Sequence, residues 1–258
     1  MEPMTIREIM DAVGGKLLGE FGDINRMVGR VETDSRTIHA GSLFVPLVGE
    51  RFDGHAYINA ALEGGAAGCF TQRERESYLP GKFYIKVDST QRALRDLAKY
   101  YKKKFPIPVV ALTGSVGKTT TKDMVAAVLG EKYRVLKTEG NLNNEIGVPM
   151  TLLRLSGEHE IAVLELGMNH AGEIDYLSAL VEPDVVLMTN IGDSHIEHFG
   201  SREKILEAKS EIFHHVKSGA FVVINGDDPL LNTLPGKLPY VFTRVGAGEG
   251  LDYRAEGL

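Results

Sequence analysis

Residues 109–121 read Val-Val-Ala-Leu-Thr-Gly-Ser-Val-Gly-Lys-Thr-Thr-Thr. The apolar run 109–112 predicts a buried strand, and the residues from Lys118 to about residue 129 predict a helix. In a glycine turn between a strand and a helix, backbone N–H groups can surround phosphate oxygens, and the helix start adds its positive dipole end. Lys118 would bring a charge to the β- and γ-phosphates, and Thr119 a hydroxyl to Mg²⁺. The segment therefore predicts a nucleoside triphosphate site with the following residues: Thr113, Gly114, Ser115, Gly117, Lys118, Thr119 and Thr120.

The glycine turn is shorter than the common phosphate loop. The pattern G-x-x-x-x-G-K-[ST] needs a glycine at position 112, where this chain has Leu112. The alternative is a glycine-rich turn with a surface lysine, but that would not require the strand, turn and helix in this order. The motif predicts nucleotide binding and leaves the reaction open.

Strands and helices alternate from residue 107 onward. Apolar, β-branched runs predict strands at 134–137, 161–166, 185–188 and 221–224, and helices are predicted at 173–181 and 202–216. Alternation of this kind implies a mostly parallel, doubly wound sheet, which binds ligands at the carboxyl ends of its strands.

The residues before 107 predict a smaller α/β unit. A capping box at residues 5–8 starts a helix that ends near residue 14, and short strands and one helix are predicted at 42–47, 57–62, 68–71 and 83–87. We therefore expect an α/β protein with an N-terminal domain at 1–88, a linker helix at 89–106 that carries the boundary, and a phosphate-loop domain at 107–258.

Composition excludes several classes of protein. The 258 residues are 43% hydrophobic and 25% charged with a net charge of −6, which argues against a protein that coats nucleic acid. The only dense basic run, 102–104, reads as a solvated helix end. Cys69 is the single cysteine and reads as a small core residue, so we expect no intrachain disulfide and a reducing, cytoplasmic location. No apolar run reaches the roughly 18 residues of a membrane span.

Three groups of polar residues in the predicted phosphate-loop domain are further candidates for the site. Glu165 ends the strand at 161–166, beside the expected phosphate loop, and could hold Mg²⁺. His195, Glu197 and His198 could hold zinc, but they lack a further ligand at a diagnostic spacing. Lys209, by its surroundings in the sequence, reads as a surface lysine.

Seven separate stretches resemble the Mur ligases, a family of ATP-dependent ligases of bacterial cell-wall synthesis. They are T-D-S-R at 33–36, G-S-L-F-V-P-L-V-G-E-R-F-D-G-H at 41–55, A-L-T-G-S-V-G-K-T-T-T-K at 111–122, E-G-N-L-N-N-E-I-G-V-P at 139–149, E-L-G-M-N at 165–169, N-I-G-D-S-H-I-E-H-F-G-S at 190–201 and E-A-K-S-E-I-F at 207–213. The resemblance implies that ATP phosphorylates the terminal carboxylate of UDP-MurNAc-tripeptide and that the amine of D-alanyl-D-alanine attacks the acyl phosphate.

The resemblance also implies roles for particular residues. Lys118, Lys209 and His195 would be catalytic, with Thr119 and Glu165 holding one Mg²⁺, His195 a second, and Lys209 a metal ligand if carbamylated. The residues implied near the UDP precursor or the phosphates are Ser35, Arg36, Asp53, Gly54, His55, Asn141 and Asn144. For the two asparagines a turn-forming role stays open, and for Arg36 a surface salt bridge does.

The family pattern places residue 258 inside the central domain. We therefore expect an incomplete central domain, an absent third domain, a monomer, and little or no ligase turnover by this chain alone. Two alternatives remain: a related ATP ligase with another acceptor, either the third-residue-adding Mur ligase or a folylpolyglutamate type, and a non-catalytic nucleotide-binding module. The stretches at 33–36 and 41–55 favour the UDP precursor, and the joint presence of Lys118, Glu165, His195 and Lys209 argues against the non-catalytic module.

Overall fold

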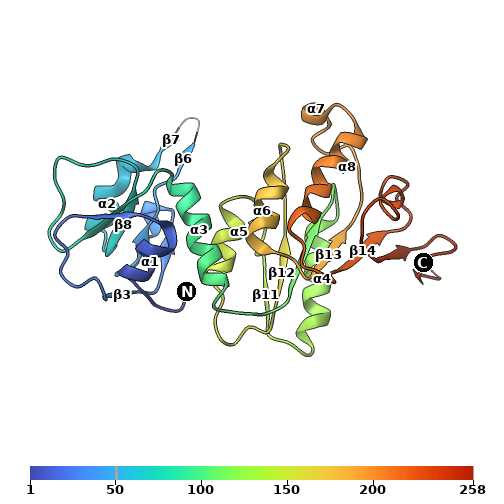
Figure 1. Ribbon diagram of the computed structural model, residues 1–258, viewed down its shortest axis with the longest axis horizontal. Coiled ribbons are helices and arrows are strands. Elements are labelled where there is room, and N and C mark those ends of the chain that lie inside the picture. The colour runs from blue at the N-terminus through green and yellow to red at the C-terminus, as the bar shows by residue number, and fades with distance from the viewer. Residues whose placement is uncertain (50–51, 258) are drawn as a thin grey trace. The chain divides into compact units, whose positions relative to one another are not determined.

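The computed structural model describes residues 1–49 and 52–257, so Glu50 and Arg51 of the family-like stretch at 41–55 lie outside it. The chain forms two compact units (Figure 1). The first contains Met1–Phe105 and Leu152–Ser156, and the second Pro106–Thr151 and Gly157–Leu258. The boundary was predicted on a linker helix at 89–106. The helix observed there, α3 (Thr90–Lys102), lies wholly within the first unit.

The first unit is built on a five-stranded mixed sheet in the order β2-β9-β8-β5-β4. Its elements are β1 (Met4–Thr5), α1 (Ile6–Val13), β2 (Lys16–Leu18), β3 (Met27–Val28), β4 (Val31–Glu32), η1 (Ser35–Thr37), β5 (Leu43–Phe44), β6 (Val48–Gly49), β7 (Phe52–Asp53), η2 (Gly54–Tyr57), α2 (Ile58–Glu63), β8 (Gly68–Thr71), β9 (Phe83–Lys86) and α3 (Thr90–Lys102). The predicted capping box is present, because Thr5 and Glu8 satisfy each other's backbone N–H groups at the start of α1. The strand predicted over 42–47 shortens to Leu43–Phe44, since Pro46 has no N–H to donate.

One core cluster of the first unit lies between α2 and this sheet. It contains the buried side chains Phe44, Ile58, Ala61, Leu62, Ala66, Cys69 and Tyr84. Burial raises the pKa of the Cys69 thiol to about 12, so Cys69 is a core residue and not a thiolate nucleophile. The prediction of a solvated helix end at 102–104 was wrong for Lys102, which is only 7% exposed.

The second unit is a seven-stranded parallel sheet in the order β11-β12-β10-β13-β14-β15-β16. Its elements are β10 (Val109–Thr113), α4 (Lys118–Gly130), β11 (Val135–Lys137), α5 (Gly147–Leu152), β12 (Ile161–Glu165), α6 (Glu173–Val181), β13 (Val185–Met188), α7 (Ile196–Phe199), α8 (Arg202–Ser210), η3 (Glu211–His215), β14 (Phe221–Asn225), η4 (Leu231–Thr233), β15 (Phe242–Gly246) and β16 (Tyr253–Arg254). This confirms the predicted α/β class with a parallel sheet.

The direction of winding reverses at β10, the third strand in the order of this sheet. From β10 the chain crosses through α4 to β11 at one edge, and from β12 it crosses through α6 to β13 on the other side of β10. Right-handed crossovers in opposite directions put α4 on one face and α6 on the other. The carboxyl ends of β10, β12 and β13 therefore form the switch point where such sheets bind ligands.

Several elements of this unit differ from the sequence predictions, and α5, α7, η4 and β16 were not predicted at all. The helix predicted over 202–216 divides into α8 and the 3₁₀ helix η3. The strand β15, Phe-Thr-Arg-Val-Gly, was not predicted, because it is half-exposed along its length and lacks an alternating apolar pattern. Among the residues described, no helix is both long enough and apolar enough to span a bilayer.

Candidate nucleotide and metal site

The phosphate loop runs from the end of β10 to the first turn of α4. Gly114 has φ +155°, and a Cβ there would lie 1.9 Å from the Thr189 hydroxyl oxygen, so only glycine fits. Gly117 adopts the left-handed conformation at φ +77° and begins α4. The turn thus has the strand, loop and helix geometry that an anion site requires.

Lys118 folds back over the loop that precedes it. Its ammonium donates to the carbonyl oxygens of Gly114 at 2.8 Å and Ser115 at 3.3 Å. Burial lowers the pKa of Lys118, and the negative charge of Glu165 opposes that shift. The cation therefore lies inside the glycine turn.

Glu165 ends β12 beside the loop and is 1% exposed. Its Oε2 accepts from the Thr119 hydroxyl at 3.0 Å, and its Oε1 accepts from the Asn143 amide at 2.8 Å. A carboxylate and a hydroxyl in contact are hard oxygen donors of the kind Mg²⁺ prefers, so these residues fit a nucleotide-bound Mg²⁺.

Asn143 was not among the site residues predicted from the sequence, although Asn141 and Asn144 of the same stretch were. The Asn144 side chain accepts from the N–H groups of Ile146 at 3.2 Å and Gly147 at 2.8 Å, the turn-forming role that was left open. Asn141 contributes its carbonyl oxygen to the same turn, as acceptor for the Asn143 N–H. The only sequence signal for Asn143 is its place in the polar run 143–145, which comes shortly after the strand predicted at 134–137.

Lys209 lies on α8 and is only 2% exposed, so its reading as a surface lysine by composition was wrong. Burial, together with a smaller contribution from the positive charge of Lys118, lowers the pKa of Lys209 to about 7. No hydrogen bond or ion pair joins its ammonium to another described residue. A large fraction of this lysine is therefore uncharged near neutral pH.

His195 is half-buried at the start of α7 and has a left-handed backbone with φ +66°. Its neighbour Ser194 donates to the Ser115 carbonyl at 3.3 Å, which brings this loop to the phosphate loop. The His195 ring makes no hydrogen bond with another described residue. Within 1–49 and 52–257, no group of three His, Cys, Asp or Glu side chains is arranged to hold a metal, which gives the zinc alternative no support.

The first unit has a separate pocket of about 400 Å³ at the T-D-S-R stretch. Arg36 in this pocket is paired with Asp34 at 2.7 Å, and that contact lowers the pKa of Asp34 to about 2. The pocket also contains Phe52 and Tyr57, whose rings stack with their centroids 5.5 Å apart. The two residues are 52% and 44% exposed. The sequence reading missed this aromatic pair.

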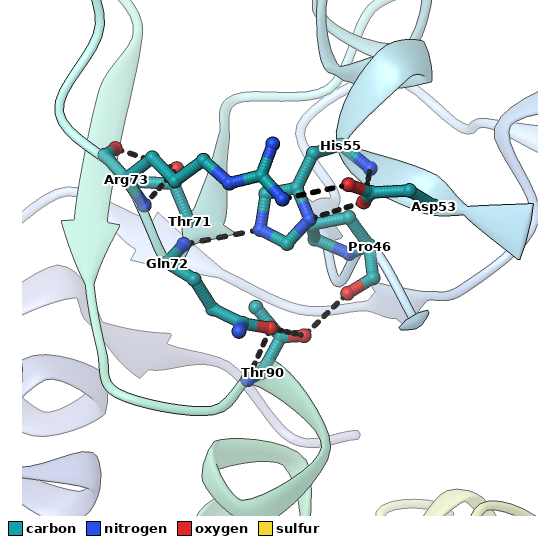
Figure 2. A network of polar contacts seen from close by, with 7 residues as sticks. All are labelled: Pro46, Asp53, His55, Thr71, Gln72, Arg73 and Thr90. Carbon is teal, nitrogen blue, oxygen red and sulfur yellow. Dashed lines mark hydrogen bonds and ion pairs between the residues drawn. The ribbon is translucent and has the colours of Figure 1, made fainter. Parts of the chain in front are cut away.

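The Asp53–His55 segment forms an internal network (Figure 2). Asp53 accepts from the His55 ring Nδ1 at 2.7 Å and from Arg73 at 3.0 Å, and the His55 Nε2 accepts from the Gln72 N–H at 3.0 Å. A Cβ on Gly54 would lie 2.7 Å from the Leu47 carbonyl oxygen. These contacts give the three residues a role in holding the η2 turn against the end of β8.

Two family models match the chain. The Mur ligase middle domain matches residues 112–256, and the Mur ligase family catalytic domain matches residues 28–102. The chain belongs to the Mur ligase family. The first match contains the phosphate loop from Thr113 onward together with Glu165 and Lys209.

This Mur ligase chain is similar to relatives named UDP-N-acetylmuramoyl-tripeptide–D-alanyl-D-alanine ligase. It is 46% identical to the one from Bacillus subtilis, over 88% of this chain and 50% of that relative. It is 42% identical to the one from Escherichia coli, over 88% and 49%. The chain thus spans about half the length of the curated relatives it matches.

Solved Mur ligase structures have the same fold. A crystal structure of MurF from Acinetobacter baumannii aligns with a TM-score of 0.89 and 36% identity, over 98% of this chain and 55% of that one. The MurF ligase from Thermotoga maritima in complex with ADP aligns with a TM-score of 0.79 and 37% identity, over 86% and 51%.

Proposed function

We propose that the full-length protein carrying this chain is an ATP-dependent amide-bond ligase of peptidoglycan synthesis, joining D-alanyl-D-alanine to UDP-MurNAc-tripeptide with release of ADP and phosphate. The observation that carries the proposal is the contact of the phosphate-loop residue Thr119 with the buried Glu165 at 3.0 Å, in a chain 46% identical to a relative named for that activity. We also propose that this protein is a monomer in the cytoplasm and that it serves cell shape and cell division.

In this proposal the phosphate loop and Lys118 hold the ATP phosphates. Thr119 and Glu165 would hold one Mg²⁺ and His195 a second; when bound, the metal would offset charge on the transferred phosphoryl group. The support is the contact of Thr119 with the buried Glu165 at 3.0 Å. Two anionic reactants must meet here, so positioning and charge neutralisation are the main catalytic tasks.

Lys209 is proposed to carry a carbamate. The uncharged amine would attack CO₂, forming an N–C bond and releasing one proton, which leaves an anionic carboxylate in place of a cation. A pKa of about 7 supports this step, because an ordinary lysine is almost fully protonated at neutral pH. The carbamate would then be a metal ligand in the same site, where a protonated lysine would repel the ion.

The pocket at the T-D-S-R stretch is proposed to take the UDP group of the precursor. Ser35 and Arg36 would face the diphosphate, with Phe52 and Tyr57 as a platform for the uracil ring. The half-exposed aromatic stack beside an arginine supports this assignment. Asp53, Gly54 and His55 would shape the neighbouring turn, and Asn141 and Asn144 the loop near the phosphates.

The test is phosphate release by the full-length protein with ATP and Mg²⁺. We expect release that requires both UDP-MurNAc-tripeptide and D-alanyl-D-alanine, with L-alanyl-L-alanine as the matched control. The Lys118→Ala variant should lose it. Release with UDP-MurNAc-dipeptide and a single amino acid would instead support the third-residue-adding ligase. Calorimetry of this chain with UDP and ADP tests the two pockets separately.

A further inference from the structure

The phosphate loop is held from outside by the segment that follows β13. The Asn190 carbonyl accepts from the Ser115 N–H at 3.0 Å, and the Asn190 side chain accepts from the Val116 N–H at 3.0 Å. The same side chain donates to the Val116 carbonyl at 3.1 Å. On the other side of Ile191, the Gly192 N–H donates to the Ser115 hydroxyl at 2.8 Å. Asn190 and Gly192 therefore hold both residues of the Ser115-Val116 turn through hydrogen bonds.

That segment is itself held by Asp228, which follows β14 and is 8% exposed. One carboxylate oxygen of Asp228 accepts from the Ile191 N–H at 2.7 Å. The other accepts from the N–H groups of Leu230 at 2.9 Å and Leu231 at 3.0 Å. The buried carboxylate of Asp228 thus links the turn after β14 to Ile191, the middle residue of the segment that holds the phosphate loop.

We propose that Asp228 is a positioning residue for nucleotide binding, acting through Ile191 and its two neighbours on the phosphate loop. This role of Asp228 depends on the proposed function in one respect only: the phosphate loop must bind a nucleotide. The short loop has two residues, Ser115 and Val116, between its glycines, and both of their N–H groups are engaged by Asn190. Their direction is therefore set by the segment that Asp228 anchors.

The adjacent carboxylate provides a matched control. Asp227 also accepts two backbone N–H groups, from Ala247 at 2.7 Å and Gly248 at 2.8 Å, but these belong to the turn after β15. The two aspartates are neighbours in the chain and hold different segments. Asp227→Asn should loosen the turn after β15 and leave the phosphate loop unchanged.

The experiment compares ADP binding, by calorimetry with Mg²⁺, in the parent chain and in the Asp228→Asn and Asp227→Asn variants. Losing a charged hydrogen bond of this kind corresponds to about a tenfold change in an equilibrium constant. We expect ADP affinity about tenfold weaker for Asp228→Asn and within twofold of the parent for Asp227→Asn. UDP binding to the first unit should stay the same in both.

A second variant covers the case in which Asp228→Asn folds poorly. Asp228→Ser keeps a short acceptor for the turn at Leu230 but cannot reach Ile191, so it should keep the fold and still weaken ADP binding. Hydrogen exchange provides a readout that needs no ligand: both Asp228 variants should speed exchange in residues 113–118, and Asp227→Asn only in residues 244–250.

Three outcomes would overturn the inference. They are parent-like ADP affinity in both Asp228 variants, equal weakening by Asp227→Asn, and unchanged exchange in residues 113–118. Failure of the proposed function is distinguishable, because the parent chain would then bind no ADP while the exchange measurement would still report on the Asp228 contact.

Discussion

Replacing Lys209 with methionine should stabilise the second unit in a pH-dependent way. Burial on α8 lowers the pKa of Lys209 from 10.5 to about 7, and the charge of Lys118 contributes. In the unfolded chain the lysine returns to its ordinary pKa, so between these values the unfolded state binds more protons than the folded state. The destabilisation is therefore complete below pH 7 and is relieved as pH rises toward 10.5.

The two pKa values set the size of the effect. Burying Lys209 costs about 4 kcal/mol at pH 7.5 and about 1.5 kcal/mol at pH 9.5, with no reduction for solvent because the side chain is 2% exposed. Methionine has a similar length and no charge to desolvate. The free energy of unfolding of Lys209→Met should exceed that of the parent, and the excess should shrink by about 2.5 kcal/mol between these pH values.

Urea denaturation followed by circular dichroism measures this difference, in buffer freed of CO₂ so that the amine stays unmodified. Lys204→Met is the matched control, since Lys204 lies exposed on the same helix and should give a small difference that is independent of pH. A constant gap between Lys209→Met and the parent from pH 7.5 to 9.5 would refute the burial argument. A variant less stable than the parent throughout would refute it as well.

Three further substitutions test other parts of the two sites. Gly114→Ala should weaken ADP binding and cost about 1–3 kcal/mol of stability, because the new methyl group meets the Thr189 hydroxyl; calorimetry and urea titration check both. Asn143→Ala should lower the free energy of unfolding by about 1–3 kcal/mol, since one oxygen of the buried Glu165 loses its donor, and unchanged stability would contradict the contact. Phe52→Ala should weaken UDP binding about tenfold by calorimetry while stability stays within about 0.5 kcal/mol; parent-like UDP affinity would reject the aromatic platform.

The parallel sheet and the phosphate loop were predictable because their signals are local. The run at 109–112 is apolar and β-branched, and the glycines at 114 and 117 occur where the backbone takes positive φ. Such patterns depend on neighbours in the chain. The strand β15 carried no such pattern because its side chains are half-exposed.

The finer parts of the site depend on contacts between distant segments, which composition does not encode. Asn143 and Asn144 are adjacent and chemically identical, yet one reaches Glu165 and the other caps a turn. Lys209 has the charged neighbours of a surface residue, and only the packing of α8 buries it. The family resemblance identified Lys209, but not Asp228 or Asn143.

The wide sequence separation of the site's contacts has a consequence for folding. Thr119 and Glu165 are 46 positions apart, and Val116 and Asn190 are 74 positions apart. Each contact closes a long loop, which costs chain entropy before any contact is gained, so we expect these contacts to form late in folding. Partly folded chains would then lack a nucleotide site, and we expect nucleotide to stabilise selectively those molecules in which β10, β12 and β13 have all assembled.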